Sequence, residues 1–245
     1  MARTIAITGA GAGLGRALAR KFSGDGETVI MLGRTLPKLT VLADALGETA
    51  MAVECNVASA DSVRAAFAQI AEKHPKIDVL INNAAVYQPF MIAEASDDQI
   101  LSPILTNLAG PILCARAAIP MMGRGGHIIN VSSESVGIDH YPMLALYQSS
   151  KAGLERFSQS LARELAPDGI RVTTFRAGQM MDESSTPPFA PEVQMRFGKA
   201  CQEVGIDLRA RPITHFNSVT QIFRMLIDAP ADLQLGTVIA EARKS

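Results

Sequence analysis

The chain has no tryptophan, only three tyrosines among its 245 residues, and no excess of charge of either sign. Its 23 lysines and arginines balance 24 aspartates and glutamates, for a formal net charge of -1. Such a balance gives no general attraction to nucleic acid or to an anionic membrane surface. We therefore expect no nucleic-acid partner, and expect small molecules or further copies of the chain instead.

Cysteine and histidine are equally scarce. The three cysteines, Cys55, Cys114 and Cys201, are odd in number and widely spaced, so we expect reduced, buried thiols and not a disulfide framework. The four histidines show no metal-ligand spacing, and we predict no metal site. Only His140 falls in an informative place, a loop that could border a substrate, although a surface position is favoured.

Long hydrophobic runs are absent too. No window of 18 or more residues lacks charges or turn-forming residues, and the chain enters an apolar strand almost at once, so we expect no membrane span, no secretion and a cytoplasmic location. With 48% hydrophobic and 19% charged residues, the chain fits one domain with a substantial core.

Glycine, by contrast, is concentrated where it is informative. An apolar run over residues 4–8 ends directly in a glycine-rich stretch, and residues 16–22 then follow helical spacing. A strand, a glycine loop and a helix in this order are typical of a dinucleotide site, where glycines let the backbone approach a pyrophosphate at the helix N-terminus. We predict that this site includes Gly9, Gly13, Leu14 and Gly15.

The next strand, residues 28–32, is followed by Gly33 and Arg34. In a dinucleotide fold, an acidic residue here would bind the adenosine ribose, whereas an arginine would pair with a 2'-phosphate. The sequence has no carboxylate at this junction, so Arg34 favours NADP(H) over NAD(H). The alternative is that Arg34 is an ordinary solvated charge.

Strand and helix patterns continue to alternate along the rest of the chain. We predict strands at 50–55, 77–81, 127–131, 170–175 and 237–240, and helices at 37–45, 59–73, 97–122, 146–166, 191–203 and 217–227. The helical segment 97–122 should be irregular near Pro103 and Pro111. This alternation predicts an α/β fold with a mostly parallel sheet and helices on both faces.

Two asparagine positions fall at points that matter for ligands. Asn83 and Ala84 follow the strand 77–81, where amide groups can satisfy the strand end or bind a ribose. Asn107 lies four residues before Pro111, which has no N–H to bond the Asn107 carbonyl, so that carbonyl is free to hold a water.

The stretch Tyr147-Gln148-Ser149-Ser150-Lys151 follows a strand that ends in serines. A spacing of four places the phenol of Tyr147 and the ammonium of Lys151 on one helix face. A free tyrosine titrates near pH ~10. A phenol that acts as acid or base near neutrality therefore needs a cation beside it to lower its pKa. Taken alone, the pair also fits a solvated helix face.

With these motifs placed, the whole chain resembles the short-chain dehydrogenase/reductase family in its compact, single-domain form. The resemblance rests on the following residues: Thr8-Gly9 with Gly13 and Gly15, Asn82-Asn83-Ala84, Asn107 with Gly110, Asn130-Val131-Ser132-Ser133, Tyr147 with Lys151, and Ile170-Arg171-Val172. It implies a doubly wound Rossmann fold with a seven-stranded sheet and a homodimer or homotetramer.

The resemblance also implies roles for individual residues. Tyr147 would be the general acid/base, Lys151 would bind the nicotinamide ribose and lower the pKa of Tyr147, Ser133 would orient the carbonyl, and the backbone of Asn107 would hold a water. Further cofactor contacts are implied for Asn56, Val57, Asn83, Ala84, Gly178 and Met180.

The chain departs from the family pattern at several positions. Asn56 replaces a frequent aspartate, and its amide oxygen can still accept a bond from the adenine amino group. Ala177 precedes Gly178 where a proline is usual. The common serine-to-tyrosine spacing lands on Glu134, which we expect to face solvent or the substrate mouth. Counting from the strand favours Ser133, with Ser135 as the alternative.

We therefore expect a hydride transfer between NADP(H) and a carbonyl or secondary alcohol. The alternatives are a C=C reductase or isomerase on the same scaffold and an NADP(H)-binding sensor without turnover. Substrate specificity should lie in residues 86–95, 134–146 and a lid segment of residues 179–215, and the sequence does not identify the substrate.

Overall fold

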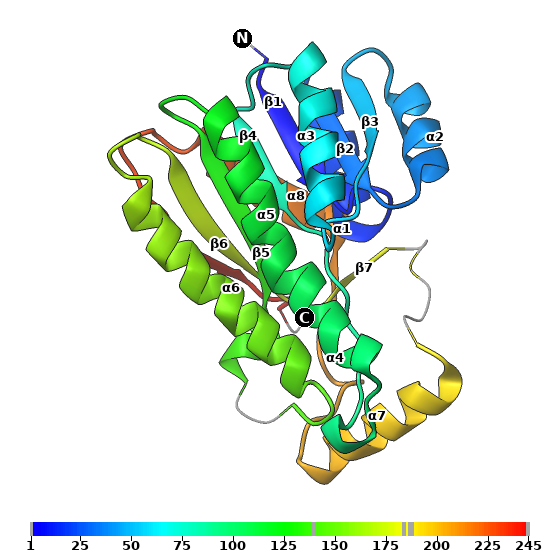
Figure 1. Cartoon of the computed structure of the whole chain (residues 1–245). Helices are drawn as coiled ribbons and strands as arrows, with labels where there is room; N and C mark the ends of the chain where they lie inside the picture. Colours follow the sequence, from blue (N-terminus) through cyan, green and yellow to red (C-terminus); the bar gives the residue numbers. More distant parts are fainter. Residues whose placement is uncertain (1, 139–140, 183–184, 186–188, 244–245) are drawn as a thin grey trace.

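Short β-branched strands separated by helices assemble into one parallel sheet in the computed structural model, which describes residues 2–138, 141–182, 185 and 189–243 (Figure 1). Its strands are β1 (Thr4–Thr8), β2 (Thr28–Gly33), β3 (Ala50–Glu54), β4 (Val79–Asn82), β5 (His127–Ser133), β6 (Arg171–Ala177) and β9 (Thr237–Ala240). They lie in the order β3-β2-β1-β4-β5-β6-β9, and every neighbouring pair is parallel. The predicted doubly wound, seven-stranded Rossmann fold is confirmed.

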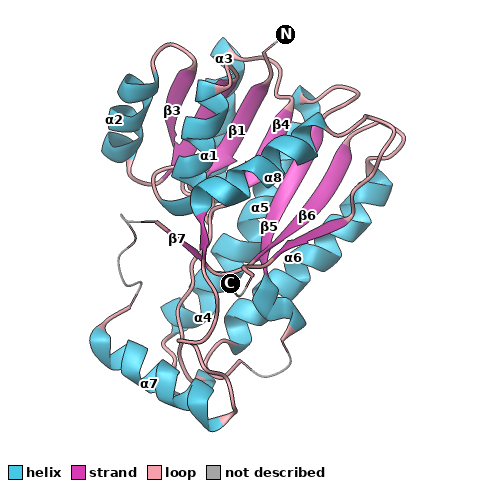
Figure 2. Cartoon of the chain, turned by 180° about the vertical axis from the view of Figure 1, so that it is seen from behind, coloured by secondary structure: helices cyan, strands magenta, loops and turns pink. Residues whose placement is uncertain are grey.

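Helices cover both faces of this sheet. They are α1 (Gly13–Gly24), α2 (Leu36–Leu46), α3 (Ala60–Lys73), α4 (Asp97–Pro103), α5 (Gly110–Ala118), α6 (Ala145–Glu164), α7 (Pro191–Glu203) and α8 (Phe216–Asp228). Helices α3, α5 and α6 cover the face seen in Figure 1, while α1 and α8 lie in front of the opposite face in Figure 2. The predicted helix ranges agree with these bounds to within a few residues.

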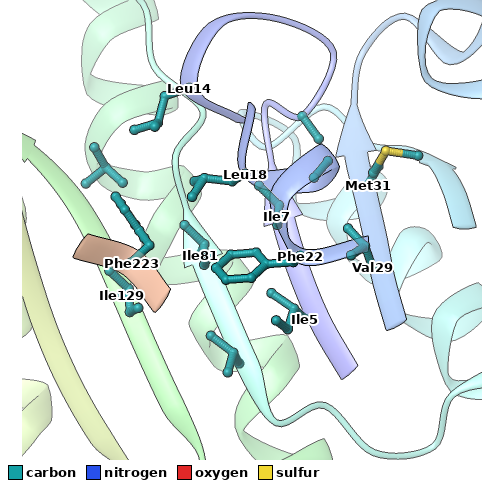
Figure 3. Close-up of a cluster of buried hydrophobic side chains, with 14 of the residues drawn as sticks. Ile5, Ile7, Leu14, Leu18, Phe22, Val29, Met31, Ile81, Ile129 and Phe223 are labelled. Carbon is teal, nitrogen blue, oxygen red and sulfur yellow. The ribbon is translucent and has the colours of Figure 1, made fainter. Parts of the chain in front are cut away.

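Successive strand residues point into two separate hydrophobic cores, one on each face of the sheet. Ile5 and Ile7 of β1 pack with Phe22 of α1 and Phe223 of α8 (Figure 3). Ala6, between the two isoleucines, belongs to the core on the side of α3, α5 and α6. Burial on both faces explains why the strands are apolar runs without polar alternation.

Strands β5 and β6 run two residues further than the sequence pattern predicts. Ser132 and Ser133 are the last residues of β5 and pair with Arg176 and Ala177 of β6. The carboxyl ends of parallel strands meet at one edge of the sheet, which is where ligands bind in this class of fold. The longer strand therefore brings Ser133 to the same edge as the glycine loop.

The predicted irregularity of the segment 97–122 is a π-helical turn, η2 (Ile104–Ala109), between α4 and α5. Its last bond joins the N–H of Gly110 to the carbonyl of Leu105, five residues earlier. Pro111 supplies no N–H at this point, so the helix widens by one residue.

The lid segment carries helix α7 over its predicted range. Phe197 and Cys201 of α7 pack on Tyr141, Met143 and Leu144, the residues that lead into α6. A small second sheet joins β7 (Met180–Met181) to β8 (Thr214–His215), which fastens the two ends of the lid together. Two-residue strands have no detectable periodicity, and the sequence did not predict them. Residues 183–184 and 186–188 of the lid lie outside the described part.

Candidate active site

The loop between β1 and α1 is too tight for a side chain at Gly9 and at Gly15. Gly9 and Gly13 have φ values of +67° and +51°. A Cβ on Gly15 would lie 2.4 Å from the carbonyl oxygen of Gly9, and one on Gly9 would lie 2.9 Å from the Cα of Ala84. The predicted loop is therefore a backbone-lined cradle, and Leu14 extends from it into the main cleft of the molecule.

Helix α1 begins in this cradle without a side-chain cap. Ala12 occupies the N-cap and supplies no hydrogen bond, and the first turn holds no acidic residue. The N–H groups of that turn therefore keep their partial positive charge for a ligand. This combination fits the pyrophosphate of NAD(P), which Gly9, Gly13 and Gly15 would approach closely.

Three predicted adenosine contacts lie at the ends of β2 and β3. Arg34 is exposed and has no hydrogen bond or ion pair within the described part of the chain. The amide oxygen of Asn56 accepts the N–H of Ala58 at 3.2 Å, which leaves one lone pair for a ligand. Val57 is buried against Gly110 of α5, so its main observed role is packing. All three cofactor contacts remain predictions.

A second hollow beside the glycine loop holds cations that the sequence reading missed. Arg16, Arg20 and Lys38 line it together with residues 11–13. Arg16 also forms an ion pair with Asp182 of the lid at 3.4 Å. Their sequence positions on two different helices gave no sign of this clustering.

The pair Asn83 and Ala84 ties the end of β4 to β1. Both backbone N–H groups donate to the hydroxyl of Thr8 at 3.0 Å, and the Asn83 amide donates to the Thr8 carbonyl at 3.0 Å. Of the two roles left open by the sequence, the structure shows the satisfaction of strand ends. Asn83 still borders the cleft, so a cofactor contact remains a prediction.

Helix α6 and the end of β5 bring together three of the predicted catalytic residues. The Ser133 hydroxyl lies close enough to the Tyr147 phenol to lower its pKa. Lys151, one turn further along α6, is only 2% exposed and donates to the Val131 carbonyl at 2.7 Å. Its nitrogen lies 6.0 Å from the centre of the Tyr147 ring. Phenol, hydroxyl and ammonium thus converge on one wall of the cleft.

The predicted direction of the Tyr147 pKa is wrong for this structure. Burial raises the pKa of Tyr147, the hydrogen bond with Ser133 lowers it, and the Glu134 carboxylate raises it further. Burial also lowers the pKa of Lys151 to about 8. The physical reason is that both groups lie in a poorly solvated wall, where each charged form is disfavoured, and that Lys151 bonds the Val131 carbonyl.

The two candidate serines differ in their surroundings. Ser133 lowers the pKa of the Tyr147 phenol, whereas Ser135 donates its N–H and its hydroxyl to the Ser133 oxygen at 3.2 and 2.9 Å. The role of Ser133 at the carbonyl remains a prediction. The backbone of Ser135 is held in turn by Gln148 of α6, at 2.6 Å. A 3₁₀ turn over Glu134–Gly137 takes up the extra residue in the loop.

Asn107 is fully buried in the π-helical turn. Its side chain exchanges two hydrogen bonds with the backbone of Val86, at 2.8 and 2.9 Å, and donates to the Ser150 hydroxyl of α6 at 3.1 Å. The side chain therefore joins the loop after β4 to the helix that carries Tyr147. The water at its backbone carbonyl remains a prediction.

Ser133, Tyr147 and Lys151 line a cleft of about 960 Å³ beneath the lid. Gly178, just before the lid, is packed closely against β9, because a Cβ there would lie 2.8 Å from the Ala240 carbonyl oxygen. Met180 also lines the cleft, and its cofactor contact stays a prediction. Tyr87, which sequence reasoning missed, packs edge-on against Tyr147 with ring centres 4.8 Å apart. Only its place in the predicted specificity loop 86–95 pointed to it.

The cleft also contains a charged group that the sequence did not reveal. Arg211 of the lid donates to the Glu134 carboxylate at 2.5 Å and to the hydroxyl of Tyr141. Arg211 follows Glu134 by 77 residues, so no local pattern could have paired them.

Three further expectations concern a membrane span, a metal site and His140. The helical run Asp97–Met121 is long and apolar enough to cross a membrane by length and composition, and 33% of its most apolar window is buried. In the fold this run contacts α3 and α6. Among the described residues, no group of three His, Cys, Asp or Glu side chains could hold a metal. His140 lies outside the described residues.

The sequence and the fold both match known proteins. The short chain dehydrogenase family matches residues 3–187. Carbonyl reductase family member 4 of Danio rerio is 31% identical over 198 residues, which cover 80% of this chain and 83% of that relative. The 3-oxoacyl-[acyl-carrier-protein] reductase of Rattus norvegicus is 31% identical over 179 residues, or 73% and 75%. The closed form of serine dehydrogenase complexed with NADP+ is 27% identical, with a TM-score of 0.79 over 97% and 94% of the two chains.

Proposed function

The chain belongs to the short-chain dehydrogenase/reductase family of NAD(P)-dependent oxidoreductases that act on carbonyl or alcohol groups, and from this premise we propose that it is an NADP(H)-dependent carbonyl reductase with Tyr147 as its proton donor. The observation that carries the proposal is that Ser133, Tyr147 and Lys151 line one cleft, with Lys151 one turn from Tyr147 on α6. Two hydroxyl groups there can hold one carbonyl oxygen.

Gly9, Gly13 and Gly15 would hold NADPH, which would supply a hydride for the carbonyl carbon. The chain's own residues manage the oxygen and the proton. Ser133 donates a hydrogen bond that orients the carbonyl, and Tyr147 donates the proton as negative charge develops on the oxygen. Lys151 places its positive charge beside the tyrosinate that remains, and Asn107 holds α6 to the adjoining loop. In the oxidative direction, Tyr147 accepts the proton.

Preference for NADP(H) is supported by the charges around the glycine loop. Arg34 stands at the end of β2, and Arg16, Arg20 and Lys38 line the neighbouring hollow. A 2'-phosphate adds negative charge that NAD(H) lacks, and arginine binds phosphate oxygens well. The similar serine dehydrogenase structure holds NADP+.

We expect Arg34→Ala to reduce the ratio of NADPH to NADH affinity by about tenfold or more, because a charge-assisted bond to the 2'-phosphate is lost. Titration of intrinsic tyrosine fluorescence or calorimetry with both cofactors measures the ratio. Arg64→Ala, an exposed residue on α3, is the matched control. An unchanged ratio in Arg34→Ala would show that Arg34 is an ordinary solvated charge.

The test of the function is a screen of ketones, aldehydes and secondary alcohols, with oxidation or reduction of the cofactor followed by absorbance. Turnover of a carbonyl compound with NADPH supports the proposal. Turnover only of conjugated alkenes would assign C=C reduction. Tight NADPH binding without turnover of any compound, and with no effect of Tyr147→Phe, would assign a sensor.

Self-association is supported by one surface. Leu101, Leu105 and Ile112 on α4, η2 and α5 are 52%, 40% and 36% exposed. Large apolar side chains gathered on one helix run are typical of a contact with another chain. We expect a homodimer or homotetramer in analytical ultracentrifugation, and expect Leu105→Lys to shift it toward the monomer. A monomeric wild-type protein at micromolar concentration would contradict this.

A further inference from the structure

An ion pair stands inside a cleft whose remaining wall is mostly apolar. The side chains of Glu134 and Arg211 are only 13% and 23% exposed. Removing two charges from water costs free energy that their mutual attraction often fails to recover. Glu134 directly follows Ser133, so stabilisation of the fold alone is a poor explanation of the Glu134–Arg211 pair. We propose that Arg211 binds a carboxylate of the substrate, so that the reductase acts on oxo acids and forms hydroxy acids.

This inference rests on the proposed carbonyl reduction and specifies its substrate. The balanced reaction takes an oxo acid, NADPH and one proton to a hydroxy acid and NADP+. The hydride forms the new C–H bond, the C=O double bond becomes single, and the proton passes from Tyr147 to the oxygen and is replaced from solvent. The carboxylate is unchanged by the reaction.

Charge in the cleft differs in sign from charge on the whole chain. Among the described residues that line it, four carry positive charge and two carry negative charge: Lys151, Lys199, Arg209 and Arg211 against Glu134 and Asp207. The complete chain has a net charge of -1. Like-signed charge that converges in a cleft raises the local concentration of a ligand of opposite charge.

Arg211 retains the donors that such a ligand needs. A guanidinium has five N–H donors in a planar fork. Arg211 uses one toward Glu134 and one toward Tyr141, so most of the fork is available to a carboxylate. Since the Tyr141 hydroxyl accepts from Arg211, its own hydrogen is a further donor beside the same site.

Glu134 positions Arg211 and is a poor site for a substrate cation. Its carboxylate already accepts from Arg211. Its second oxygen lies against Gly178, where an added Cβ would be 3.2 Å away. Arg211 also lies 5.6 Å from the Tyr141 ring centre, which fixes the plane of the guanidinium further. The pair therefore presents donors, and an anion fits better than an ammonium group.

Residues on both sides of this pair define the rest of the substrate. Ser133, Tyr147 and Arg211 line the same cleft, and the Glu134 charge acts on the Tyr147 phenol, so the carboxylate site lies near the carbonyl site. Tyr87, Leu144, Phe189, Phe197, Ile206 and Leu208 line the remaining cleft. The carbon skeleton between and around the two polar groups should therefore be apolar.

The test uses the 2-, 3-, 4- and 5-oxo derivatives of hexanoic acid, their methyl esters, and 2-hexanone. We expect wild-type kcat/KM for at least one acid to exceed that for its ester by about tenfold or more, because only the acid pairs with Arg211. Arg211→Met should abolish that preference while kcat/KM for the ester and for 2-hexanone changes less than about threefold. Arg196→Met, an exposed lid arginine on α7 that does not line the cleft, is the matched control and should keep the preference.

A second variant and a binding measurement guard against misfolding or an inactive preparation. Tyr141→Phe removes only a hydroxyl and should reduce the acid preference by about threefold to tenfold. In calorimetry with NADP+ present, hexanoate should bind wild-type protein about tenfold more tightly than hexanamide, and the two should bind Arg211→Met alike.

Two results would overturn the inference: equal kcat/KM for acids and esters in the wild type, or an equal fall for both in Arg211→Met, which would make Arg211 a lid-positioning residue. Failure of the proposed function looks different, since no carbonyl compound, charged or uncharged, would then oxidise NADPH. In that case the calorimetric comparison of hexanoate with hexanamide still decides whether Arg211 binds a carboxylate.

Discussion

Lys151 is fully buried in a wall of the cleft, where its charge is costly. Burial lowers its pKa from the ordinary 10.5 to about 8, although its ammonium donates to the Val131 carbonyl. As the pH rises, a base with a lowered pKa in the folded state loses its proton at a lower pH than the same base in the unfolded chain. Between pH 8 and 10.5 the unfolded state therefore holds more protons, and the stability that Lys151 contributes rises with pH.

We expect the free energy of unfolding of the wild type, relative to Lys151→Met, to rise by up to about 1.4 kcal/mol per pH unit across this window. Urea denaturation at several pH values measures it. The exposed Lys73→Met should give a curve parallel to the wild type. Parallel curves for wild type and Lys151→Met would show that Lys151 titrates normally.

Spacing predicted that Ser133, Tyr147 and Lys151 would lie together, and they line one cleft, because these residues lie close in sequence or at the end of one strand. It could not give the direction of the Tyr147 pKa, since that depends on burial by the distant lid. Arg211 was missed for the same reason: it reaches Glu134 only after the lid folds back over the cleft. The sequence shows the chemical type of each residue and its spacing from its neighbours. The removal of a side chain from water depends on the folded structure.

At the scale of elements, the end of β5 decides which serine meets the phenol. The strand extends to Ser133, and the following 3₁₀ turn over Glu134–Gly137 absorbs the additional loop residue. Ser135 lies behind Ser133 and donates to it.

Ser133→Ala should lower kcat by about 10²-fold or more, because a donor to the carbonyl oxygen is lost. Ser135→Ala should lower it by about tenfold or less, since it removes a bond to Ser133 and no direct contact with the carbonyl. Steady-state kinetics with a carbonyl found in the screen give both values. A larger loss in Ser135→Ala would place the wrong serine at the substrate.

Long, strongly patterned helices were predictable, as α3 and α6 show. The π-helical turn was foreseen only as an irregularity near Pro111, because sequence shows the missing N–H but not how the helix rearranges around it. The pairing of β7 with β8 was not foreseen, since it joins residues more than thirty positions apart through strands of two residues.

The whole molecule places its reactive groups at one edge of the sheet. Strand order β3-β2-β1-β4-β5-β6-β9 sets the glycine loop after β1 and the serines after β5 at the same carboxyl ends. The alternation of strands and helices predicted this arrangement, because parallel strands joined by helical crossovers leave few alternative topologies. It did not predict the chemistry of the cleft beneath the lid, to which α7 and Arg211 contribute.

The central claim is that the Tyr147 phenol transfers the proton in an NADP(H)-dependent carbonyl reduction. Its most direct test is kcat of Tyr147→Phe, measured together with the NADPH dissociation constant of the same preparation. We predict that kcat falls by about 10²–10⁴-fold while the dissociation constant stays within about threefold of the wild-type value. A variant that binds NADPH normally and reduces carbonyl compounds at the wild-type rate would contradict the claim.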